Sequence, residues 1–334
     1  MTTPMPAPTP APSPAPTNLP KYDVRPYQPD GGFTASGLVT MLGAMLVAGA
    51  VIGFAAHWVS QLFYLIILFP ILIGLFLGAV GMRLVKFANL RNPLLGGLAG
   101  FVGGIAAMTM MHYFDFQKFR RDVTTHAPDV ADVARLPAAQ RASEYAQFEN
   151  PNGARELVEA YDSFQGFMNF EARQGVEIKS TRGSSSSAKP LNLGFVGSYI
   201  YWVVELLIVA GVTFAMVRGQ TREPFCTECS LWKSFRRLGA FGGEPETALA
   251  GVTGGDVNAL AAAQPGVLDS PLELHVAECD NCRRAGANVK LEQLTTNHKG
   301  QLERKVLAHT VWPAESVSVL DSLFAPPAAP PAPA

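Results

Sequence analysis

The fold is decided by residues 31–82, which read GGFTASGLVTMLGAMLVAGAVIGFAAHWVSQLFYLIILFPILIGLFLGAVGM. These 52 residues contain no Asp, Glu, Lys or Arg. A membrane-spanning helix needs about 20 apolar residues, so the run is too long for one crossing and suits two crossings joined by a turn. Its one polar cluster, HWVSQ at 57–61, marks that turn. We expect the first helix near 37–57 and the second near 62–82, with Pro70 kinking the second.

Two further stretches of low charge extend the pattern. Residues 92–114 contain no charged side chain, and residues 190–217 contain one, Glu205. They predict a third helix near 93–113 and a fourth near 193–218. Charged residues make up 16% of the chain, against about 25% in a typical soluble domain. The predicted fold class is therefore a mainly α membrane protein with four transmembrane helices, and a wholly cytosolic protein is excluded.

The helices divide the chain into eight segments. In order, these are a disordered Pro/Ala-rich N-terminal tail (1–35), helices 1 and 2 (36–82), a basic cytoplasmic loop (83–92), helix 3 (93–113), a helical extracytoplasmic loop (114–192), helix 4 (193–218), a cytoplasmic domain (219–324) and a disordered Pro/Ala tail (325–334). The tails contain little to bury and favour extended, disordered chain. In the long loop, apolar residues recur at helical spacing over 138–148 and 154–172, which predicts a helical hairpin.

Basic residues near the helix ends predict the orientation. Arg83, Lys86 and Arg91 lie between helices 2 and 3, and more bases follow helix 4, whereas the turn between helices 1 and 2 has none. Cytoplasmic loops carry an excess of Lys and Arg. The bases after helix 3 oppose this, but they open a loop too long to follow the rule. We expect a multi-pass protein of the cell (inner) membrane with both termini cytoplasmic, and the Ala/Gly/Pro-rich composition is compatible with a bacterial origin.

The segment after helix 4 has the composition of a small soluble domain. Alternating apolar residues predict strands at 272–277, 288–294 and 305–312. Helical patterns occupy 244–264 and 315–324. The sequence therefore predicts an α+β domain in which helices flank a few antiparallel strands.

The four cysteines of the chain form two CxxC pairs in this domain: Cys226 with Cys229, and Cys279 with Cys282. Two such turns can present four thiolates to one tetrahedral metal ion, as in a structural Zn²⁺ site, and iron is the alternative metal. A disulfide scaffold requires an oxidising compartment, whereas the charge pattern places the domain in the reducing cytosol. A site with four protein ligands is closed to substrate, which argues against metal-assisted hydrolysis.

The spacing of the pairs is unusual, because 49 residues separate Cys229 from Cys279, against about 15–20 in a compact ribbon. A helical insertion over 230–264 accounts for the excess. With its Phe225-Cys226-x-x-Cys229-x-x-Trp232 motif and a strand leading into Cys279, the domain resembles the split zinc ribbons appended to uncharacterised bacterial multi-pass membrane proteins. The resemblance covers roughly a third of the chain, and it implies a bound metal without implying an activity.

Two features lie within the predicted membrane helices. Glycines recur at four-residue spacing, which favours close helix packing or self-association, at Gly49/Gly53, Gly74/Gly78 and Gly96/Gly100/Gly104. The acid Glu205 lies near the centre of helix 4, where a charge costs about 2.5–3.5 kcal/mol. It is therefore a candidate proton or cation site, with an interhelical hydrogen bond to Thr40 or Thr109 as the structural alternative.

Several functional hypotheses follow. The first is a scaffold or interaction protein in the lipid bilayer, whose cytoplasmic zinc ribbon contacts a partner protein. The alternative is a transporter or an ion- or proton-conducting protein that uses Glu205, and a weaker alternative is a thiol redox sensor. No enzyme is predicted, because the sequence contains no nucleophile–base pair, phosphate loop or paired-carboxylate motif. The net charge of −1 excludes a nucleic-acid binder driven by bulk charge.

Overall fold

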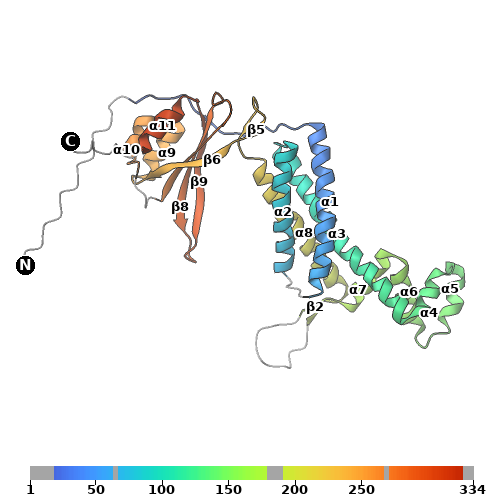
Figure 1. Ribbon diagram of the computed structural model, residues 1–334. Helices are drawn as coiled ribbons and strands as arrows, with labels where there is room; N and C mark the ends of the chain where they lie inside the picture. The colour runs from blue at the N-terminus through green and yellow to red at the C-terminus, as the bar shows by residue number, and fades with distance from the viewer. Residues whose placement is uncertain (1–18, 63–66, 179–190, 267–270, 326–334) are drawn as a thin grey trace, which may run out of the picture. The chain divides into compact units, whose positions relative to one another are not determined.

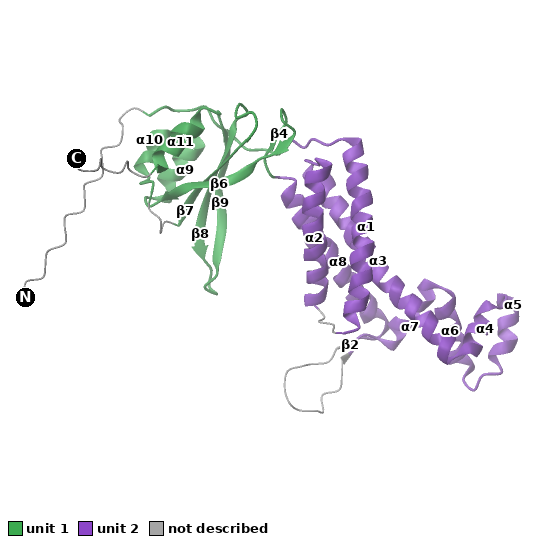
Figure 2. Ribbon diagram, in the orientation of Figure 1, with its two compact units in different colours: residues 1–29, 223–334 green, residues 30–222 purple. Residues whose placement is uncertain are grey.

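The computed structural model describes residues 19–62, 67–178, 191–266 and 271–325 (Figure 1). The chain divides into two compact units, one formed by residues 1–29 with 223–334 and the other by residues 30–222 (unit 1 and unit 2, Figure 2). Among these described residues, unit 2 contains four helices that are long and apolar enough to cross a membrane. This confirms the mainly helical class with four candidate spans. Most of the two Pro/Ala tails lies outside the described residues.

The four long helices of unit 2 are α1 (Ala35–Ser60), α2 (Leu68–Ala88), α3 (Pro93–His126) and α8 (Gly194–Gln220). Helix α2 begins six residues later than the sequence predicted, so Pro70 falls in its first turn, where proline removes no helical hydrogen bond. The expected kink is therefore wrong. Arg83 and Lys86 belong to the end of α2, and the expected basic loop shrinks to residues 89–92.

Helix α3 continues well past the expected end at residue 113. Its 34 residues span about 51 Å, against about 30 Å of membrane hydrocarbon. The charged residues that begin at Asp115 end the apolar pattern without ending the helix, because hydropathy and helix propensity are separate properties. The extension packs Val123 into a small core with Val130, Val158 and Tyr161.

Four shorter helices follow in the long loop: α4 (Pro128–Arg135), α5 (Ala138–Tyr145), α6 (Pro151–Asp162) and α7 (Phe164–Gln174). The helix expected over 154–172 is broken at Ser163, whose backbone is extended. Its side-chain hydroxyl oxygen caps α7 by accepting a hydrogen bond from the Gly166 amide. Two short strands, β2 (Glu177–Ile178) and β3 (Leu191–Asn192), pair and lead back to α8.

The recurring glycines are helix contact points within the chain. On α1, a Cβ at Gly53 would collide with the backbone of Ala107 on α3. On α3, a Cβ at Gly104 would lie 2.6 Å from the Cα of Ala210 on α8. Lipid supplies little hydrophobic drive for association, so close backbone approach of this kind stabilises a helical bundle.

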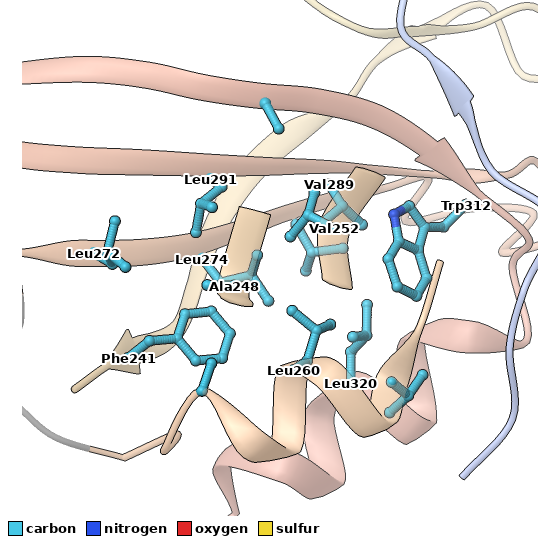
Figure 3. Packing of buried hydrophobic residues seen from close by; sticks show 14 of the residues in the cluster. Phe241, Ala248, Val252, Leu260, Leu272, Leu274, Val289, Leu291, Trp312 and Leu320 are labelled. Atoms are coloured by element: carbon cyan, nitrogen blue, oxygen red, sulfur yellow. The ribbon is translucent and has the colours of Figure 1, made fainter. Parts of the chain in front are cut away.

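Unit 1 is built on a five-stranded antiparallel sheet in the order β1 (Arg25–Pro26), β9 (Leu302–Trp312), β8 (Ala287–Thr296), β7 (Leu272–Glu278), β6 (Ser234–Phe241). Helices α9 (Pro245–Gly254), α10 (Val257–Ala262) and α11 (Ser316–Phe324) cover one face. Alternate strand residues point into the core between the two layers, where Phe241, Leu274, Leu291 and Trp312 surround Leu260 of α10 (Figure 3).

Two expectations for this unit are wrong. The segment after the first CxxC pair is not a helical insertion throughout, because residues 234–241 form β6, a strand of the sheet. The N-terminal segment 1–35 is not all tail, because Tyr22 donates its backbone N–H to Gly255 and residues 25–26 pair with β9. The proline-rich composition obscures Tyr22 and Val24, which pack against the core.

Candidate metal centre

Two short turns carry the four cysteines. In the first knuckle (residues 225–232), β4 (Phe225–Cys226) pairs with β5 (Leu231–Trp232). The Phe225 and Trp232 rings meet edge to face, with centroids 5.2 Å apart. In the second knuckle (residues 279–283), the chain turns directly after β7 ends at Glu278.

Strand pairing brings the two knuckles together. Strand β6 leaves the first knuckle and β7 enters the second, and the two are antiparallel neighbours with Ser234 opposite Glu278. This register places the end of one knuckle beside the start of the other, although 49 residues separate Cys229 from Cys279 in the sequence. The intervening helices α9 and α10 fold back onto the sheet without separating the cysteines.

The four sulfurs lie within 4.8 Å of one another, and the Sγ atoms of Cys226 and Cys282 are 3.7 Å apart. A tetrahedral ion with metal–sulfur bonds of about 2.3 Å requires sulfur–sulfur edges of about 3.8 Å. A disulfide requires about 2.05 Å, and all four cysteines are free. The structure therefore brings together the four predicted ligands at the spacing of a metal site, with Cys226 and Cys279 buried.

The second knuckle favours thiolates. The backbone amide of Cys282, followed by that of Asn281, outweighs burial and lowers the pKa of Cys279 to about 6. The amides of Ala285 and Arg284 likewise lower the pKa of Cys282. In the first knuckle, burial raises the pKa of Cys226. Four adjacent sulfurs repel one another as anions, so a divalent cation would displace the protons that remain.

Both knuckles share a backbone feature that the sequence did not reveal. The residue directly after each second cysteine is left-handed, with φ of 53° at Ser230 and 48° at Arg283. This conformation costs an L-residue about 1–2 kcal/mol, and glycine is its usual occupant. A glycine at these two positions would have indicated a left-handed backbone from the sequence, but the residues there are serine and arginine.

Lys233 is a second residue that the sequence did not single out. Its side chain is buried, and its Nζ donates to the carbonyl of Gly286 at 2.6 Å and to Oδ1 of Asn288 at 3.2 Å. It thereby ties the chain after the first knuckle to the chain after the second. The ammonium also lies close enough to the sulfurs to offset part of the charge of −2 that four thiolates and a divalent ion would carry.

A second group of side chains that could ligate a metal lies on the face of the same sheet that the helices do not cover. Glu273, His275 and Glu292 have ligand atoms within 4.8 Å of one another. Lys290 Nζ lies 2.7 Å from Glu292, and Arg237 lies 3.1 Å from Glu273. Burial alone would raise the pKa of Glu292, but the neighbouring cations, Lys290 above all, have the larger effect and lower it. We interpret this group as an ion-pair network, because its carboxylates already have cationic partners.

Glu205, the remaining predicted site residue, is 2% exposed on α8. Tyr201, one turn earlier on the same helix, donates its hydroxyl to Oε1 of Glu205 at 2.5 Å. This hydrogen bond joins two residues of the same helix, whereas the sequence suggested a partner on another helix. Glu205 also lines a cavity of unit 2, together with residues of α1, α3 and α7.

Comparisons with protein-family models, with curated proteins and with solved structures gave no match. The function is therefore inferred from the residues of this chain, and its four-cysteine centre provides the most specific chemistry.

Proposed function

We propose that the chain is an integral membrane interaction protein whose unit 1 is a split zinc ribbon that faces the cytoplasm and contacts a partner protein. The observation that carries the proposal is the set of four free thiols with a 3.7 Å sulfur–sulfur edge, close to that of a ZnS₄ tetrahedron. The bases at the end of α2 and after α8 support the cytoplasmic side.

The metal in this proposal is structural. Four cysteine ligands leave no open coordination position, so the ion supplies folding free energy and not a reactive water. Zinc is proposed because it is the usual occupant of closed four-thiolate sites. Iron in the same geometry would colour the protein, which separates the two metals by absorbance.

The surface proposed for the partner is the far end of the β8–β9 hairpin. It extends past the beginning of β7, where Leu272 pairs with Gln293, and it carries the exposed apolar side chain of Leu302. Val306, also exposed, follows on β9 opposite Glu292. Leu302 is 75% exposed. Exposed apolar side chains on a projecting hairpin suit binding to another protein.

The metal is tested on the full-length protein purified in detergent without added zinc. We expect about one zinc per chain by mass spectrometry of the metal content. An excess of chelator should remove the zinc and the hydrogen-exchange protection of β6–β8, while α1 and α3 keep theirs, because apo zinc ribbons lose their folding free energy. Retention of protection in unit 1 after complete metal loss would contradict the proposal.

The partner contact is tested in native membranes with a photo-crosslinking amino acid at position 302. A specific protein adduct is expected there and not from Glu246, an exposed residue of α9 that serves as the control. Equal labelling from both positions, or none from 302, would rule out the hairpin as the contact surface.

A further inference from the structure

Unit 2 contains a cavity of about 490 Å³ that the metal centre does not explain. It is lined by the end of α1, the second half of α3, α7 and the first half of α8. This volume lies within the range of about 300–1,000 Å³ that is usual for small-molecule sites. It is much larger than a bare metal ion requires.

The charged side chains that line the cavity indicate whether a ligand would be a cation or an anion. Four carboxylates line the cavity, those of Asp115, Asp122, Glu171 and Glu205, against one lysine, Lys118. Asp115 has a histidine partner, because Nδ1 of His57 lies 2.7 Å from its Oδ1. Acidic side chains still outnumber basic ones in the lining, and such an excess attracts cations and repels anions.

The carboxylates also crowd one another. Burial, followed by the charge of Asp115, raises the pKa of Glu171 on α7. A like charge close to a carboxylate disfavours its ionised form, and a bound cation relieves that repulsion. Glu205 is held at the wall of the same cavity by the Tyr201 hydroxyl, so its carboxylate has a fixed place in the lining.

Aromatic rings and methionine thioethers supply a large part of the remaining lining. Trp202 and Phe167 contribute to it, and so do Met111 and Met168. The Trp202 ring is positioned by an edge-to-face contact with Tyr199, with centroids 5.2 Å apart. Aromatic faces together with carboxylates are the combination that recognises ammonium groups, whereas hard metal ions prefer oxygen ligands alone.

We propose that this cavity binds a small organic cation, an amine with one or two ammonium groups, with Glu205 and Glu171 as its acidic contacts and Trp202 as its aromatic contact. The proposal is independent of the metal centre, because every lining residue belongs to unit 2.

The test is calorimetric titration of the full-length, metal-loaded protein in lipid nanodiscs with 1,4-diaminobutane, and with 1,4-butanediol as its uncharged counterpart. The diamine should bind and the diol should not. Glu205→Gln removes the acidic group at nearly constant shape, so it should weaken diamine binding at least tenfold. Glu149→Gln, which changes an exposed acid outside the cavity lining, should leave binding unchanged.

Three results would overturn the proposal: no binding of the diamine, equal binding by wild type and Glu205→Gln, or binding of Ca²⁺ or Mg²⁺ in preference to the amine at this site. If Glu205→Gln fails to fold, Glu171→Gln and Trp202→Leu replace it, and each should weaken diamine binding at least several-fold. Unchanged binding by both folded replacements would also overturn it. The zinc content measured in the same samples keeps this outcome separate from that of the metal centre.

Discussion

Unit 1 and unit 2 both join segments that are distant in the sequence, but they do so with different contacts. In unit 1, the β6–β7 ladder brings the sulfur of Cys226 to 3.7 Å from that of Cys282. In unit 2, glycines let helices meet backbone to backbone, as Gly53 does with Ala107. Water drives the apolar core of unit 1 together, whereas lipid would supply no comparable drive to the four membrane-length helices of unit 2. Loss of a metal should therefore affect one unit, and an added methyl group the other.

The largest expected effect is Cys279→Ser. It removes a ligand whose site is expected to supply much of the folding free energy of unit 1, since structural zinc contributes about 10–16 kcal/mol in small peptides. Unit 1 should lose zinc and hydrogen-exchange protection while unit 2 keeps its helices. Asn281→Ser, which changes an exposed residue of the same turn, is the control. A Cys279→Ser protein that retains wild-type zinc content would contradict the comparison.

The converse effect is expected from Gly53→Ala in unit 2. The added methyl group meets the Ala107 backbone, and overpacking of this kind costs about 1–3 kcal/mol. Gly43→Ala is the matched control, since a Cβ there has nothing within 4 Å. Thermal unfolding of the detergent-solubilised protein should show destabilisation by the first change alone, with zinc content unaffected. Equal melting temperatures for the two variants would show that close approach does not stabilise the bundle.

A pH dependence is expected in unit 1. Burial, followed by the charge of Lys290, lowers the pKa of His309 on β9 to about 4, from the value of 6.5 that is usual for an exposed histidine. The folded state therefore binds the proton less readily than the unfolded chain, so stability is complete above pH 6.5 and is lost as the pH falls towards 4. We expect the loss to reach about 1–3 kcal/mol.

His309→Gln removes this titration, and the measurement is the difference in unfolding free energy between wild type and variant at about pH 7 and about pH 5. Acid also protonates the thiolates, but that loss is common to both proteins and cancels in the difference. A difference that does not change with pH would show that His309 is not held neutral by the fold.

The smallest expected effect concerns the left-handed residue of the first knuckle. Ser230→Gly removes the Cβ that disfavours this backbone, whereas Ser230→Ala retains it. The metal-loaded glycine variant should be more stable than the alanine variant by about 1 kcal/mol, as measured by chelator resistance and melting temperature. Equal stability of the alanine and glycine variants would show that the left-handed backbone at position 230 does not cost the knuckle stability.

Much of unit 2 was predictable because hydropathy is a local property. The uncharged run at 31–82 and Pro93 at the start of α3 gave the approximate limits of the spans. The extension of α3 was missed, because the charged residues from Asp115 onward end the apolar pattern, while Val123 of the same extension packs with Val158 and Tyr161 of α6. The assignment of segment 19–29 to unit 1 was missed as well, because strand pairing with β9 is a long-range contact.

The sequence by itself determined that four helices can span a membrane and that four thiols are available as metal ligands. Both follow from the chemistry of short segments. Only the tertiary structure decided that 49 intervening residues do not keep the two CxxC pairs apart, because the β6–β7 register is a pairing between distant strands. It also placed Lys233 beside the sulfurs and Glu205 in a cavity with Glu171. Such proximities depend on packing, which no single segment encodes.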